Sequence, residues 1–184
     1  ITFNPAPENH GYKIKRTDLP EQPIIDAVAE NVINTQRGTV IGKKDIQIST
    51  IEHAMAALYA AGIDNCLIEV DAPEFPILDG SSRFYTEGIS KVGLKKQTAN
   101  KQYYIVKHKI EVKDEETGAS IMILPEDNFS VNVLVSYNSP VLTNQYAVMD
   151  DLSQFPSEIS ASRTFVFVRE IEMLIQNNLI KGGD

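Results

Sequence analysis

The stretch STIEHAMAALYAAGIDNCLIEV, residues 49–70, decides the fold of this chain. Apolar residues recur at helical spacing from Ile51 to Ala61, and Gly62 is typical of a helix end, so the first half predicts a helix. The apolar run from Cys66 to Val70 follows a short polar turn and predicts a buried strand. This stretch already places the chain among proteins that mix helices and strands.

On the N-terminal side of this stretch, short apolar runs alternate with prolines and polar turns. Four of these runs predict strands, at residues 1–4, 12–16, 23–28 and 38–41. On the C-terminal side, Asp79 and Gly80 form a turn to which we assign no chemistry. Ser81 can cap a second helix over residues 82–92.

Residues 93–101 are polar and unpatterned, and they mark the expected boundary between two domains. Beyond this boundary, strands are expected over residues 103–112, 119–124 and 129–137, and a helix from about residue 169 to 177. Strands followed by helices, twice over, predict the α+β class with two layered domains. We expect the first domain over residues 1–95 and the second over residues 96–184.

The composition excludes several classes of protein. The net charge of −8 at pH 7 argues against a nucleic-acid surface, because phosphate binding needs clustered Lys and Arg. The basic cluster of Lys95, Lys96 and Lys101 is interpreted as a solvated linker. Cys66 is the single cysteine, and we expect a buried structural thiol in a reducing compartment. Since no apolar run approaches the ~20 residues that span a bilayer and no signal peptide is visible, we expect a soluble cytoplasmic protein without a transmembrane segment.

His53 stands apart from the other histidines because it follows Glu52 at the expected helix start. A neutral imidazole can ligate zinc, and a neighbouring carboxylate can take a proton from metal-bound water. The local sequence favours a plainer interpretation, in which Ser49 and Glu52 form a capping box and His53 lies on the helix surface. The zinc-helix patterns H-E-x-x-H and H-x-x-E-H both need a second histidine, and none stands around this pair.

Two blocks of sequence match a wider pattern. The first contains ISTIEH (48–53), AAL (56–58), GIDN (62–65), EV (69–70) and PILDGS (76–81). The second contains ISASRTF (159–165), Phe167, Arg169, Ile171-Glu172 and Gly182-Gly183, and NPAP (4–7) and RTDL (16–19) fit as well. In order and spacing these residues resemble the UDP-3-O-acyl-N-acetylglucosamine deacetylases of lipid A biosynthesis. The resemblance runs nearly from end to end.

The resemblance implies two similar two-layer α/β sandwich domains, with zinc and the active site between them. It implies that the acetamide of a UDP-acylglucosamine substrate is hydrolysed to acetate and a free amine. His53 matches a zinc ligand, Glu52 matches the general base, and Thr164 matches a hydroxyl that helps hold the oxyanion. These roles agree with the chemistry, because zinc lowers the pKa of bound water to about 7 and an oxyanion needs donors held ready.

The family's substrate contacts and its hydrophobic passage for the acyl chain match Phe165, Phe167, Ile171 and Ile180. An apolar passage binds a fatty chain with ~0.8 kcal/mol per buried methylene. Without the resemblance, Phe165, Phe167 and Ile171 would be interpreted as core residues.

The match to the family is incomplete. Members of the family complete the metal site with a further His and an Asp on one helix turn, and they use another His and a Lys. None of these four residues lies within this sequence, and His10 and His108 do not match their positions. We therefore expect a fragment that lacks the start of the first domain and the later zinc-ligand segment. Because catalytic zinc takes three protein ligands, we expect weak zinc binding or none and no activity from these residues alone. Some members are fused at the C-terminus to a dehydratase, and the parent of this chain is a candidate for the same fusion.

The alternative to an enzyme is a non-catalytic lipid- or partner-binding domain on the same fold. Glu52 would then be a helix cap, and the region from Phe165 to Ile171 a groove. A small-molecule kinase is a weaker alternative, since no Gly-rich phosphate loop is present.

Overall fold

The computed structural model describes residues 1–137 and 139–176. The chain divides into two compact units, one containing residues 1–99 together with the chain from Pro156 onward, and one containing residues 100–155. Helices and several small sheets are both present, so the α+β class is confirmed. The expected domains at residues 1–95 and 96–184 stay a prediction. Among the described residues, no helix has both the length and the apolar character needed to cross a bilayer.

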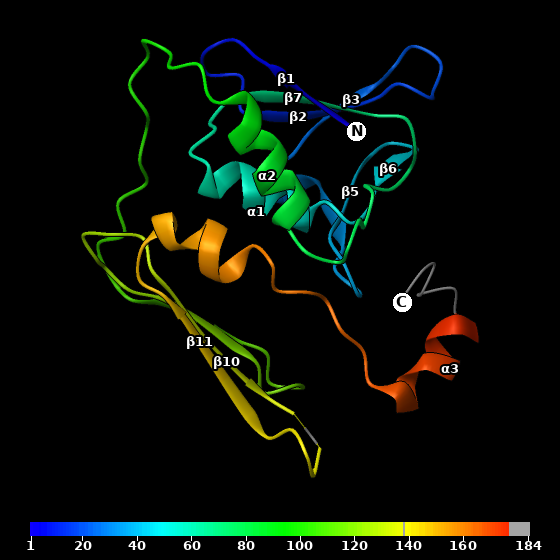
Figure 1. Ribbon diagram of the computed structural model, residues 1–184, viewed down its shortest axis with the longest axis vertical. Coiled ribbons are helices and arrows are strands. Elements are labelled where there is room, and N and C mark those ends of the chain that lie inside the picture. Colours follow the sequence, from blue (N-terminus) through cyan, green and yellow to red (C-terminus); the bar gives the residue numbers. More distant parts are fainter. Residues whose placement is uncertain (138, 177–184) are drawn as a thin grey trace. The chain divides into compact units, whose positions relative to one another are not determined.

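A four-stranded sheet forms one layer of the first unit (Figure 1). Its order is β1 (Thr2–Pro5), β7 (Cys66–Val70), β2 (Tyr12–Arg16) and β3 (Ile24–Asp26). β7 is parallel to β2 and antiparallel to β1, and β3 is antiparallel to β2. The four strands predicted in these regions are therefore confirmed. Alternate residues of β7 are buried, as expected for a strand with one face on a core.

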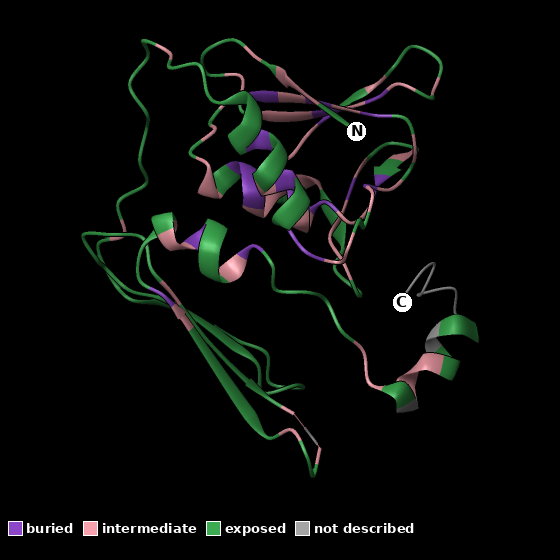
Figure 2. Ribbon diagram, viewed as in Figure 1, coloured by how far each residue is buried: buried purple, intermediate pink, exposed green. Residues whose placement is uncertain are grey.

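Two helices, α1 (Glu52–Ala60) and α2 (Arg83–Val92), cover one face of this sheet (Figure 1). Ala54, Ala57 and Leu58 of α1 are fully buried, together with Ile14 and Ile68 of the sheet. Figure 2 shows the buried residues gathered on the sheet strands and α1. Because full burial of one such isoleucine or leucine stabilises the fold by about 1.5–3 kcal/mol, this layer contact holds the unit together.

A small second sheet leads into α1. It contains β4 (Val32–Asn34), β5 (Val40–Lys43) and β6 (Ile46–Ile48) in that order, all antiparallel, and a short 3-10 helix η1 (Ala29–Asn31) precedes it. β5 confirms the strand predicted at residues 38–41. β4 and β6 were not predicted, because three residues are too few to show an alternating pattern.

The predicted capping box at the start of α1 is wrong. The N-cap is Ile51, and no side chain caps the helix. The Ser49 N–H donates to the Pro73 carbonyl at 3.0 Å, and the Phe75 N–H donates to the Ser49 carbonyl at 3.0 Å. Ser49 is therefore bound to a neighbouring segment, which no local pattern reveals. The predicted end of the helix is confirmed, since Gly62 has a φ of +74°.

The second unit contains two antiparallel hairpins (Figure 1). β8 (Ile110–Lys113) pairs with β9 (Ser120–Ile123), and β10 (Val131–Ser136) pairs with β11 (Asn144–Met149). The strand expected over residues 103–112 forms only at its end, and β11 was not predicted. Within the described part of residues 100–155, only Met149 and Phe155 are buried (Figure 2).

Three short helices follow in the described residues up to Gln176. The 3-10 helix η2 (Leu152–Gln154) has a capping box between Asp151 and Gln154. The π-helix η3 (Phe155–Ile159) follows. Over the described residues, α3 (Val168–Gln176) confirms the helix expected from about residue 169.

Candidate active site

Glu52 and His53 are the first two residues of α1, and both are half-buried. Glu52 Oε2 accepts a hydrogen bond at 2.9 Å from the N–H of Thr39, the residue before β5. The helix dipole also favours a carboxylate in the first turn. The interpretation of Glu52 as a partner of Ser49 in a cap is therefore wrong, and its carboxylate is directed instead by Thr39, the residue before β5.

The backbone next to Thr39 lies unusually close to the carboxylate. A Cβ added at Gly38 would lie 3.3 Å from Glu52 Oε1, which is tighter than most side-chain contacts. Because glycine has no side chain, the backbone before β5 can pass beside the carboxylate. This contact was missed because Thr39 and Glu52 are separated by 13 positions and share no motif.

Thr164 lies beside His53. Its Oγ1 is 3.4 Å from His53 Nε2, a long hydrogen-bond distance between residues 111 positions apart. Thr164 itself is exposed. An imidazole and a hydroxyl thus meet at the start of α1, where Glu52 is the neighbouring residue in the chain.

The turn at Asp79 and Gly80 holds Thr164 in this place. The Thr164 N–H donates to the Gly80 carbonyl at 2.8 Å, and Arg163 Nε donates to the Asp79 carbonyl at 2.6 Å. The turn is itself stabilised, because the Ser81 hydroxyl donates to the Asp79 carboxylate and lowers the pKa of that group. Sequence reasoning gave this turn no role, whereas the structure gives it a positioning role.

The aromatic residues after Thr164 are not all in a core. Phe165 and Phe167 meet edge to face, with ring centroids 5.7 Å apart and planes at 82°. Phe165 is 53% exposed, so the interpretation of this residue as a core side chain is wrong. Ile171, on α3, is half-buried. Ile180, the last expected substrate contact, lies outside the described residues.

An ion pair connects α3 to the chain before β5. Arg37 Nη2 lies 3.0 Å from Glu170 Oε2, and both side chains are partly exposed. An exposed pair of this kind contributes about 0–1 kcal/mol, so it orients the two segments more than it stabilises them.

The donor set does not by itself match a catalytic zinc site, which needs three protein ligands. In the described part of the chain, no three His, Cys, Asp or Glu side chains are grouped to hold a metal ion. His53 offers one imidazole nitrogen, and the described residues alone do not fit a complete site.

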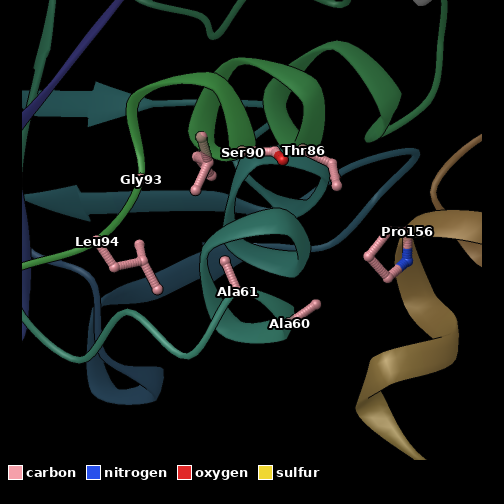
Figure 3. A pocket seen from close by; sticks show the side chains of 8 residues that line it. Ala60, Ala61, Thr86, Ser90, Gly93, Leu94 and Pro156 are labelled. Atoms are coloured by element: carbon pink, nitrogen blue, oxygen red, sulfur yellow. The ribbon is translucent and has the colours of Figure 1, made fainter.

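A cavity of about 330 Å³ lies at the other end of α1. Figure 3 shows Ala60 at the end of this helix and the C-cap residue Ala61 facing it, with Thr86 and Ser90 of α2 and with Pro156. At a rise of about 1.5 Å per residue, this end of the nine-residue helix is about 12 Å from Glu52 and His53. The cavity is therefore separate from the candidate active site.

Comparison with known proteins agrees with the motifs. The whole chain, residues 1–184, matches the family described as LpxC: UDP-3-O-acyl N-acetylglycosamine deacetylase. It is 61% identical over 184 residues to a bifunctional enzyme LpxC/FabZ of Bacteroides thetaiotaomicron and 58% identical to one of Porphyromonas gingivalis, matching all of this chain and 40% of each relative. It is 43% identical over 187 residues to a UDP-3-O-acyl-N-acetylglucosamine deacetylase of Shewanella halifaxensis, matching all of this chain and 60% of that relative. The chain thus spans about half the length of these relatives, and it belongs to the UDP-3-O-acyl N-acetylglycosamine deacetylase family.

Proposed function

We propose that this chain is part of a zinc-dependent enzyme that removes the N-acetyl group of UDP-3-O-acyl-N-acetylglucosamine in lipid A biosynthesis, in the cytoplasm. The observation that carries the proposal is the 3.4 Å approach of the Thr164 hydroxyl to the His53 imidazole, next to Glu52. Residues far apart in the chain, each with a chemical role implied by the resemblance, meet at one place. The names of the relatives supply the substrate class.

The reaction adds water to the acetamide carbonyl carbon and breaks the C–N bond, which yields acetate and a free amine. Glu52 accepts the proton of the attacking water. The Thr39 N–H holds one carboxylate oxygen at 2.9 Å, so the base is oriented before the substrate binds. The Thr164 hydroxyl donates to the oxygen on which negative charge develops, and the loss of one such donor typically costs about 10²–10³ in kcat.

His53 is proposed as one zinc ligand. Since a catalytic zinc takes three protein ligands, the others are expected outside the described residues of this chain.

Phe165, Phe167 and Ile171 are proposed to contact the acyl chain of the substrate, together with Ile180. The exposure of Phe165 supports this role, because contact between its solvent-exposed ring and a fatty chain removes apolar surface of both from water. The relatives named LpxC/FabZ support a second activity, a dehydratase, on the same polypeptide.

Acetate release by the complete, zinc-loaded protein tests the proposal. We expect Glu52→Gln to lower kcat by about 10²–10⁴ with unchanged zinc content, because only the proton acceptor is lost. His53→Ala should abolish turnover and lower the bound zinc measured by atomic absorption.

Matched controls are Glu87→Gln and His108→Ala, which change exposed residues of the same types outside the site. Both should keep wild-type turnover. Near-normal kcat in Glu52→Gln would contradict the assigned base. Binding of acylated sugar that persists with a chelator, without any acetate release, would favour the non-catalytic binding domain instead.

A further inference from the structure

Thr50 has an unusual backbone conformation for its residue type. Its φ is +60°, in the left-handed region that β-branched residues rarely enter. Glycine or asparagine would adopt this conformation with less strain. Outliers of this kind persist only where the surrounding structure holds them, and they gather at functional sites.

Thr50 is held through the segment that contains Glu74. Its hydroxyl donates to Glu74 Oε1 at 2.7 Å. The preceding residue, Ser49, forms a parallel bridge with Glu74 and exchanges backbone hydrogen bonds with Pro73 and Phe75. Phe75 is only 1% exposed, so the segment that carries Glu74 is anchored in the core.

The turn at Thr50 determines where α1 begins. Ile51 is buried and is the N-cap, and Glu52 and His53 follow at once. Because no side chain caps the helix, its first turn is directed by the conformation of Thr50 and by the Thr39 contact to Glu52. A change at Thr50 is therefore transmitted directly to the carboxylate and the imidazole.

We propose that Thr50 and Glu74 form a positioning pair, which keeps the first turn of α1 oriented so that Glu52 and His53 stay directed at the substrate. The inference rests on the proposed function of Glu52 and His53. Neither member of the pair touches the reacting atoms, so its effect is expected in kcat rather than in KM.

The test compares variants of the complete protein that differ in one hydrogen-bonding group. Thr50→Val keeps the branched shape but loses the donor, and Glu74→Leu loses the acceptor. Both should lower kcat by about tenfold or more with KM within about twofold, as expected for a small misplacement of catalytic groups. Thr50→Ser and Glu74→Gln keep a donor and an acceptor, and they should rescue kcat to within about threefold of wild type.

Two further measurements separate positioning from a merely structural role. Thr50→Gly removes the hydroxyl and also relieves the strained φ, so it should fold normally by its melting temperature and still lose kcat. Amide hydrogen exchange of residues 51–58 should rise in Thr50→Val and stay unchanged in Thr50→Ser.

The positioning pair is overturned if Thr50→Gly or Thr50→Val turns over at the wild-type rate, or if Thr50→Ser is impaired as much as Thr50→Val. If wild-type protein releases no acetate, the proposed function fails. In that case, amide hydrogen exchange of residues 51–58 in Thr50→Val and Thr50→Ser still tests whether the pair orients the first turn of α1.

Discussion

At the scale of single residues, backbone groups place the side chains of the candidate site. The Thr39 N–H directs Glu52, and the Gly80 carbonyl accepts from the Thr164 N–H. Gly80 has a φ of +79°, which other residues adopt only with strain. A substitution at Gly80 therefore affects both the fold and the place of Thr164.

We expect Gly80→Ala to lower the free energy of unfolding by about 1–2 kcal/mol, because an alanine is strained at this φ. We also expect a lower kcat, since an added Cβ would lie 3.9 Å from the backbone of Thr164 and any relaxation of the turn moves that residue. Urea unfolding and acetate release of the complete protein measure the two effects. Gly88→Ala in α2 is the control and should stabilise by about 0.5–1 kcal/mol, because that glycine is helical and has open space around it. An unchanged stability of Gly80→Ala would show that the turn relaxes freely.

At the scale of secondary-structure elements, Tyr85 connects α2 to its surroundings. Its ring lies 5.9 Å from that of Phe3 on β1, and its hydroxyl donates to the Pro76 carbonyl at 2.7 Å. Burial raises the pKa of Tyr85 to about 12. The neutral phenol is therefore part of how the helix is held on the sheet.

This raised pKa predicts a loss of stability at high pH. The pKa of a tyrosine is about 10 in the unfolded chain and about 12 for the folded Tyr85. The neutral Tyr85 phenol therefore contributes fully to the free energy of unfolding below pH 10, and this contribution is lost as the pH rises from 10 to 12. Tyr85→Phe cannot ionise. It should lower the free energy of unfolding by about 0.5–1.5 kcal/mol at pH 8, where the hydrogen bond is lost.

The difference in the free energy of unfolding between wild type and Tyr85→Phe should then narrow above pH 10, as measured by urea unfolding between pH 8 and pH 12. Some alkaline loss should remain in the variant, because burial also raises the pKa of Tyr12 to about 12. Tyr104→Phe is the control, since Tyr104 is 86% exposed. A gap that stays constant up to pH 12 would contradict the assignment to Tyr85.

At the scale of the whole molecule, the two units differ in how much they bury. The first has a continuous core between its sheet and helices, whereas the second has two hairpins with mostly exposed residues. Isolated two-stranded hairpins are marginally stable in water. The candidate site lies within the first unit. At this site His53 supplies one imidazole, and the described residues of the chain contain no group of three metal ligands.

The 184-residue chain by itself should therefore release no acetate and bind zinc weakly or not at all. Isothermal titration with zinc and an acetate assay, both run beside the complete protein as positive control, measure this. Turnover by the isolated chain would show that its own residues complete the site.

The elements that could be predicted are those with a strong local pattern. The strands at residues 12–16 and 66–70 follow from apolar spacing, and the helix before Gly62 follows from apolar spacing and a stop signal. The short strands β4 and β6 could not be found this way, since their pairing partners, and not their own sequences, make them strands.

The sequence by itself determined the α+β class, the main helices and strands of the first unit, and membership of the family, because apolar periodicity and motif spacing are properties of neighbouring residues. Only the tertiary structure decided that Ser49 binds residues 73–75 rather than capping a helix, that Thr39 directs Glu52, and that Gly80 holds Thr164 beside His53. Each of these is a hydrogen bond between segments distant in the chain. Such bonds depend on how the layers pack, and a backbone N–H or carbonyl is the same at every residue, so no residue type marks where they form.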